Sequence, residues 1–141
     1  MLIDVYLYNV GRNLNRAFRT CFSFGVKNLF LVGKSFDRSI AWELKGNLYS
    51  AKEEVNIKYL DKLPSIGNLL ALENYYSNSI YDLGIKNWQQ IKGIVIGGES
   101  KGIPKDLEFG YMRKIPTINN FCLTVEASLA IGLSEYWRHK C

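Results

Sequence analysis

The chain has 141 residues, of which 48% are hydrophobic and 22% charged, a composition typical of one ordinary globular domain. Its formal net charge of +5 indicates a moderate preference for polyanionic partners. No apolar run approaches the ~20 residues of a membrane span and no basic-then-apolar leader follows Met1, so we expect a cytoplasmic protein with no membrane partner. The cysteines are few and widely spaced and His139 is the single histidine, which disfavours a disulfide framework, a metal site and histidine-dependent nucleophilic catalysis.

Strand-like and helix-like patterns alternate along the first part of the chain. The segment from Leu2 to Tyr8 alternates in polarity and is rich in β-branched and aromatic residues, whereas the next segment has the spacing of an amphipathic helix that Gly25 is placed to end. The patterns predict strands at residues 2–8, 27–33 and 55–60 and a helix at 13–24, and they leave 35–50 unassigned.

The second part of the chain continues this alternation. The patterns predict a helix from Pro64 to about Tyr75 with Ile66, Leu69, Leu70 and Leu72 inward, a short strand at 78–83, a helical turn at 85–90, strands at 92–97 and 109–115, and a helix at 124–140. Such an order predicts one α/β domain, residues 1–141, with a mostly parallel sheet flanked by helices. The last helix is apolar on more than one face, so we expect it to be buried or to lie at a subunit interface.

The stretch from Ile94 to Pro104 is the most informative in the chain. An apolar strand runs directly into Gly97 and Gly98, and Glu99 stands on the turn that follows. Ligands of open α/β sheets bind outside the carboxyl ends of the strands, and a flat ligand could lie against glycine amides. A plain strand-to-turn exit with a solvated Glu99 would give the same pattern.

Three arginines lie on the polar face of the first predicted helix. Arg12, Arg16 and Arg19 fall opposite the apolar residues, at the sheet edge where Gly97 should also lie. Ordinary solvation accounts for many such stripes, but phosphate groups of a nucleic acid would bind the same face.

Three segments of the chain together resemble the SPOUT class of RNA methyltransferases, in its SpoU (TrmH-like) branch. The first motif of that family is an Asn six residues before an Arg in a helix that ends in Phe-Gly-Val, and the chain has Asn13, Arg19 and Phe24-Gly25-Val26. The second, Gly-x-Glu-x-x-Gly-ϕ-Pro, is matched throughout by Gly97, Glu99 and Gly102-Ile103-Pro104. The third is matched in part, by Ile115-Pro116, Ile118 and the segment Cys122–Glu126.

The chain departs from the family pattern at three positions. Asn15 stands where the family usually has Gly, Cys122 replaces the usual Ser, and Thr124 replaces the usual Asn. Threonine keeps a hydroxyl that donates and accepts, whereas cysteine loses a strong donor.

The resemblance implies a deep trefoil knot near the C-terminus, a homodimer, and a cofactor site for S-adenosylmethionine built from the three loops. It implies methyl transfer to a ribose 2′-hydroxyl of RNA, with tRNA favoured over rRNA because no separate RNA-binding domain is present. Arg19 would be an electrostatic clamp on the ribose and its phosphate, Asn13 would orient it, and Glu99 would hold either of them. Transferred position by position, the cofactor-binding residues are Gly97, Gly98, Glu99, Gly102, Ile115, Pro116, Ile118, Leu123, Thr124 and Ala127, and the RNA-binding residues are Arg12, Arg16, Arg19 and Lys101, aided by Lys105.

Two other functions remain open at this stage. The changes at Cys122 and Thr124 would also suit a degenerate member of the class that binds RNA or cofactor without methyl transfer. A generic α/β nucleotide-binding protein is less favoured, since Gly97-Gly98 has neither the glycine spacing of a dinucleotide fingerprint nor the Gly-Lys-Ser/Thr ending of a P-loop.

Overall fold

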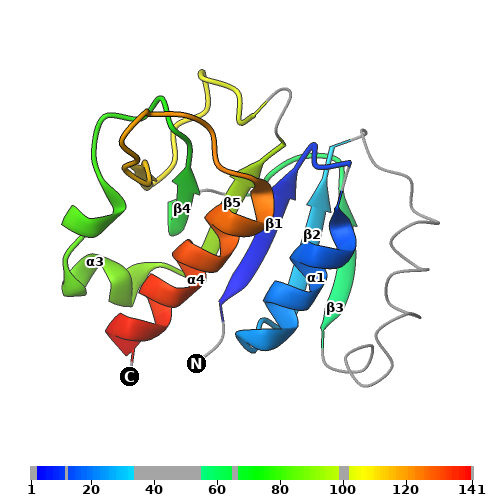
Figure 1. Ribbon diagram of the computed structural model, residues 1–141. Coiled ribbons are helices and arrows are strands. Elements are labelled where there is room, and N and C mark those ends of the chain that lie inside the picture. Colours follow the sequence, from blue (N-terminus) through cyan, green and yellow to red (C-terminus); the bar gives the residue numbers. More distant parts are fainter. Residues whose placement is uncertain (1–2, 12, 34–54, 65–66, 99–101, 141) are drawn as a thin grey trace.

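The fold is a six-stranded parallel sheet with helices on one face (Figure 1). The computed structural model describes residues 3–11, 13–33, 55–64, 67–98 and 102–140. The elements in chain order are β1 (Asp4–Tyr8), α1 (Leu14–Ser23), β2 (Asn28–Val32), β3 (Asn56–Leu60), β4 (Leu69–Leu72), a 3₁₀ turn (Ile80–Asp82), α3 (Ile85–Gln90), β5 (Gly93–Gly97), β6 (Tyr111–Arg113) and α4 (Val125–Lys140).

The strand order β3-β2-β1-β5-β4-β6 places β1 and β5 at the centre of the sheet. The chain adds β2 and β3 on one side of β1 and the remaining strands on the other side, so the order of winding reverses between β1 and β5. Such a reversal opens a crevice at the carboxyl ends of the strands, which is where ligands of doubly wound sheets bind.

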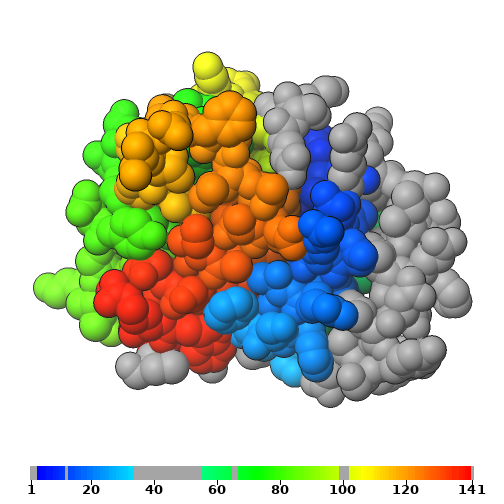
Figure 2. Space-filling model, viewed as in Figure 1, coloured from blue at the N-terminus to red at the C-terminus, as the bar shows by residue number. Residues whose placement is uncertain are grey.

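Both faces of the sheet are buried. Alternate residues of the central strands pack against α1, α3 and α4 on one face, with Trp88 and Tyr136 among the fully buried side chains. The side chains of α1 and α4 and of the segment before α4 cover this face in the space-filling view (Figure 2). The other face carries a second cluster, in which Val95, Ile103 and Phe109 are buried. No described helix combines the length and the apolar character that crossing a bilayer requires.

The first predicted helix ends where its sequence indicates. Gly25 has φ +74°, its amide donates to Phe22, and the amide of Val26 donates to Cys21 at 2.9 Å. This pair of bonds is a Schellman motif, which satisfies carbonyls that the helix end would otherwise leave free. The predicted mostly parallel α/β sheet is confirmed, as are the strands at 2–8, 27–33, 55–60, 92–97 and 109–115, each within a few residues of its observed bounds.

Two local predictions are wrong. Residues 69–72 form strand β4, not part of a helix from Pro64 to Tyr75, and all four of its residues are buried. Because β4 lies between β5 and β6 with both faces covered, it lacks the alternation that identifies a half-exposed strand. The strand predicted at 78–83 is a 3₁₀ turn, in which the Ser79 side chain accepts a hydrogen bond from the Tyr81 amide. Ser79 also forms one isolated bridge with Lys114. Residues 35–50 and Ile66 lie outside the described residues.

The burial of β4 leads to a prediction about the free energy of unfolding. Leu70 is fully buried in the larger core, so Leu70→Ala should lower the free energy of unfolding by ~2–5 kcal/mol through lost burial and a residual cavity. Ile85→Ala removes a similar amount of side chain from a position that is 56% exposed and should change stability by only about 0.5 kcal/mol. Urea unfolding of both variants measures the difference, and equal losses would contradict the packing of β4.

Candidate functional site

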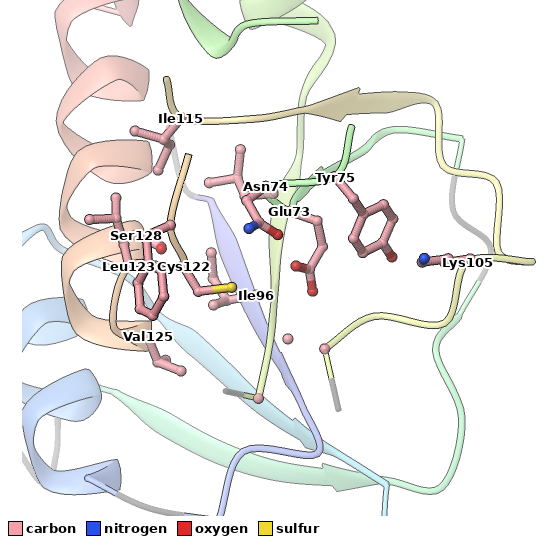
Figure 3. Close-up of a pocket in the computed structure, with 15 residues that line it drawn as sticks. Glu73, Asn74, Tyr75, Ile96, Lys105, Ile115, Cys122, Leu123, Val125 and Ser128 are labelled. Carbon is pink, nitrogen blue, oxygen red and sulfur yellow. The ribbon is translucent and has the colours of Figure 1, made fainter. Parts of the chain in front are cut away.

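A cavity of about 280 Å³ lies at the carboxyl ends of β4 and β5 (Figure 3). Its volume is near the lower end of the roughly 300–1,000 Å³ that small-molecule sites span. Three chain segments well apart in sequence, together with the ends of the two strands, form its walls. The lining residues are Leu72, Glu73, Asn74, Tyr75, Ile96, Gly97, Gly98, Gly102, Lys105, Ile115, Phe121, Cys122, Leu123, Val125 and Ser128.

The glycines of this site allow the loop to pack closely against the sheet. A Cβ at Gly97 would lie 2.6 Å from the Ile103 nitrogen, and one at Gly98 would lie 2.4 Å from the Asn9 oxygen. The amide of Gly98 donates to Tyr8, and that of Gly102 donates to Gly98. The amides of Gly98 and Gly102 therefore donate to protein atoms. The expectation that a flat ligand lies against Gly97 and Gly98 stays a prediction.

The segment that follows β4 holds the backbone of Ile103 at both its amide and its carbonyl. Oε1 of Glu73 accepts a hydrogen bond from the Ile103 amide at 2.7 Å, and the hydroxyl of Tyr75 donates to the Ile103 carbonyl. Burial raises the pKa of Glu73, while the backbone amides of Ile103 and Asn74 act in the opposite direction. The Tyr75 ring in turn packs under Lys105, whose Nζ lies 5.2 Å from the ring centroid. A half-buried carboxyl group thus fixes the loop and also faces the cavity.

The third segment supplies the opposite wall. Of its predicted cofactor-binding residues, Ile115 and Leu123 line the cavity, whereas Pro116, Ile118, Thr124 and Ala127 do not. The Thr124 hydroxyl accepts the amide of Ala127 at 3.2 Å, which makes it the N-cap of α4. Thr124 therefore has a structural role at the start of α4, where its hydroxyl caps the helix. Its contact with the cofactor stays a prediction. Ile118 is fully exposed.

The predicted catalytic and RNA-binding residues of α1 lie outside the cavity. Asn13 is exposed at the start of α1 with φ 55°, and Arg16 and Arg19 are exposed on the helix. Nη1 of Arg16 forms an ion pair with Oε1 of Glu126 at 3.0 Å, which ties α1 to the first turn of α4 beside the cavity. Arg19 is not among the residues that line the cavity of its own chain, and its role at the acceptor stays a prediction.

Three predicted site residues lie outside the described residues: Arg12, Glu99 and Lys101. The predicted residues that the structure brings together are Gly97, Gly98, Gly102, Ile115 and Leu123, with Lys105 beside them. In the described part of the chain, no cluster of three or more His, Cys, Asp or Glu side chains could hold a metal ion.

The cavity residues that the sequence did not indicate come mainly from two places. Glu73, Asn74 and Tyr75 were assigned to a helix, although Leu-Leu-Ala-Leu followed by polar residues is also the pattern of a buried strand with its carboxyl-end turn. Val125 lies within the matched segment Cys122–Glu126, and Phe121 and Ser128 lie just outside it; spacing alone could not select these three as cavity residues.

The fold is shared with solved RNA methyltransferases. The chain is 20% identical to an S-adenosylmethionine-bound rRNA methyltransferase from Sinorhizobium meliloti, with a TM-score of 0.80 over 99% of this chain and 57% of that one. It is 20% identical, with a TM-score of 0.81 over 99% and 96% of the chains, to a protein solved for the 2-OH methylation of C/U34 on tRNA. It is 15% identical, with a TM-score of 0.79 over 99% and 58%, to the SpoU methyltransferase AviRb from Streptomyces viridochromogenes in complex with S-adenosylmethionine.

These similarities confirm the resemblance to SpoU-type enzymes at the level of the fold. The chain spans little more than half the length of two of these three proteins. No protein-family model matches the chain, and no curated protein does.

The two described cysteines make a prediction about the cavity wall. Cys122 is exposed and lines the cavity, whereas Cys21 is fully buried and burial raises the pKa of its thiol. In a Cys141→Ser background, Ellman's reagent should therefore modify one thiol rapidly and the second only on unfolding, because the thiolate is the reactive form. Equal rates for both thiols in the folded protein would contradict this placement, and Cys122→Ser should remove the fast phase alone.

Proposed function

We propose that this chain transfers a methyl group from S-adenosylmethionine to RNA, at a ribose 2′-hydroxyl. The observation that carries the proposal is the meeting of the segments at 97–105 and 115–128 in one cavity at the carboxyl ends of β4 and β5, in a fold shared with RNA methyltransferases. The 2′-hydroxyl as acceptor rests on the motif residues and on the neighbour associated with tRNA 2-OH methylation.

The cavity suits a bent nucleoside bearing an amino acid. Apolar side chains of Leu72, Ile96 and Leu123 offer contact to a base, while Glu73, Asn74 and Ser128 offer polar groups. The glycine contacts set the loop close enough to the strand ends to keep the cavity small. When bound, S-adenosylmethionine supplies an electrophilic methyl group, and the chain contributes binding, orientation and partial exclusion of water.

The arginines of α1 bear on the acceptor. A guanidinium on phosphate and ribose lowers the cost of an alkoxide that develops beside it, which is the role proposed for Arg19 with Asn13 and Glu99 in support. Because Arg19 does not line the cavity of its own chain, this role requires RNA or the second copy of a homodimer to bridge α1 and the cavity. Phe121 in the cavity lining and Ile118 in the same segment are exposed apolar residues, which a homodimer interface would cover.

We extend the proposal to three properties that the family resemblance implies. The segment after residue 115 would thread through the loop that carries Gly97–Pro104 as a trefoil knot, the substrate would be a tRNA in preference to an rRNA, and the protein would work in the cytoplasm. The basic face of Arg12, Arg16, Arg19 and Lys101 would neutralise phosphates, so RNA binding should weaken as salt rises.

The decisive experiment supplies labelled S-adenosylmethionine and RNA together. The protein should transfer tritiated methyl groups to a tRNA pool. The modified linkage should resist alkaline hydrolysis, because a methylated 2′-oxygen cannot attack the adjacent 3′-phosphate. If the label is found on a base, the protein is an RNA methyltransferase but the ribose is not its acceptor. Cofactor binding without transfer to any RNA would favour the second candidate, a binding module without turnover, which the position of Arg19 away from the cavity also suits.

A pair of substitutions on α4 tests the cavity as the cofactor site. Ser128 lines the cavity, and Ser134 is exposed on the same helix. The two positions therefore give a matched pair of Ser→Phe substitutions. Ser128→Phe should fill the cavity and abolish calorimetric binding of S-adenosylhomocysteine, while Ser134→Phe should bind as the wild type does. Unchanged binding by a folded Ser128→Phe protein would exclude the cavity as the site.

A second prediction separates catalysis from cofactor binding. Arg19→Ala should reduce methyl transfer by about 100-fold or more, as expected when a charge-stabilising donor is lost, and leave S-adenosylhomocysteine affinity unchanged. Arg138→Ala, at the far end of α4, is the control and should leave both methyl transfer and S-adenosylhomocysteine affinity unchanged. Loss of cofactor affinity in Arg19→Ala would refute this assignment.

A further inference from the structure

Glu73 is the charged group placed nearest the centre of the cavity. It follows β4 directly, and the alternation of the strand puts it on the same face as Gly97 of the neighbouring strand β5. A Cβ at either Gly97 or Gly102 would lie 2.7 Å from its Oε1, so the carboxyl group lies over both glycines. Figure 3 shows this group extending into the open middle of the cavity, on the side that Cys122 faces.

Only part of the hydrogen-bonding capacity of this carboxyl group is used by the protein. Oε1 accepts the Ile103 amide at 2.7 Å, and the Asn74 amide also bonds to the carboxyl group. A carboxylate has about four acceptor positions, so some remain for a ligand. Among the described residues, no basic side chain lies within ion-pair distance of Glu73, and the other charged residue of the lining, Lys105, packs over Tyr75 instead. A half-buried carboxylate with no cationic partner in the described part of the chain favours a ligand that brings positive charge.

We propose that Glu73 recognises the positive charge of the methyl donor and so distinguishes S-adenosylmethionine from its product. This inference rests on the proposed function, which supplies the ligand. The two molecules differ at one sulfur atom, a sulfonium cation in the donor and a neutral thioether in the product. A carboxylate in the same small cavity attracts the first more than the second, since the charge interaction is strengthened where water is partly excluded.

Burial raises the pKa of Glu73, so part of the cost of ionising this group is already present in the folded chain. A bound cation offsets that cost, whereas a neutral product does not. Loss of the sulfonium charge on methyl transfer would then weaken the hold on the product and favour its release.

Glu73→Gln separates charge from structure. The glutamine carbonyl still accepts the Ile103 amide, so the loop keeps its attachment while the negative charge is removed. Calorimetry with each ligand should show S-adenosylmethionine binding about tenfold more weakly and S-adenosylhomocysteine binding within about twofold of the wild type. Glu73→Asp retains the charge and should keep the wild-type affinity ratio to a larger extent than Glu73→Gln.

Tyr75→Phe is the matched structural control. It removes the other hydrogen bond to the Ile103 peptide without altering charge, so it should shift both affinities by the same factor. If Glu73→Gln also weakens both ligands equally, Glu73 is only a loop attachment and the inference is overturned. If Glu73→Gln does not fold, Glu73→Asp is compared with the wild type in its place. Its carboxylate is one methylene shorter, so a smaller preference for the donor supports charge recognition, and an unchanged ratio overturns it.

Failure of the broader proposal has a different outcome. If the wild-type protein binds neither ligand, the proposed function fails and this inference fails with it. If both ligands bind and the ratio of their affinities does not change when the charge at Glu73 is removed, the proposed function stands and the inference alone is rejected.

Discussion

The site depends on one residue, Ile103, whose backbone is held at both its amide and its carbonyl. The amide of Ile103 donates to Glu73 and its carbonyl accepts from Tyr75, and both of these side chains come from the three residues that follow β4. Since Ile103 is also buried in the second hydrophobic cluster, two polar bonds and apolar packing fix the same point of the loop. The loop thereby stays close to the strand ends, and the cavity forms between it and the segment before α4.

The topology of the sheet explains why the cavity lies where it does. All described strands run parallel, so their carboxyl ends share one edge, and the reversal of strand order between β1 and β5 leaves room there. Helix α4 begins at the same edge because Thr124 caps it, and its first turn carries both the cavity residue Val125 and Glu126, the partner of Arg16. That surface pair adds little to stability, on the order of 0–1 kcal/mol, but it places the basic face of α1 next to the cavity rim.

Much of the fold could be predicted from local patterns because most elements obey simple rules. The strand at Gly93–Gly97 and the helix end at Gly25 follow from apolar runs and glycine backbone freedom. Strand β4 could not be distinguished from a helix because burial on both faces removes periodicity from a four-residue run. Because of that error, Glu73 and Tyr75 were assigned to a helix, and the sequence did not identify them as the residues that hold the loop.

The candidate site was predictable where a motif depends on backbone geometry and less so where it depends on side chains. Gly97, Gly98 and Gly102 fall at the cavity because close packing excludes a Cβ at each of them. Thr124 and Ala127 were assigned to the cofactor by resemblance, whereas the bond between them at the start of α4 depends on where the helix begins. The position of Arg19 relative to the cavity depends on tertiary arrangement, and helical spacing identifies only the face on which it lies.

A crystal structure of the protein with S-adenosylhomocysteine tests the central claim most directly. Density for the ligand should fill the cavity between Glu73, Gly97 and Leu123, with the Ile103 peptide still bonded to Glu73 and Tyr75. Ligand density elsewhere on the protein, with this cavity open or closed by its own side chains, would contradict the account.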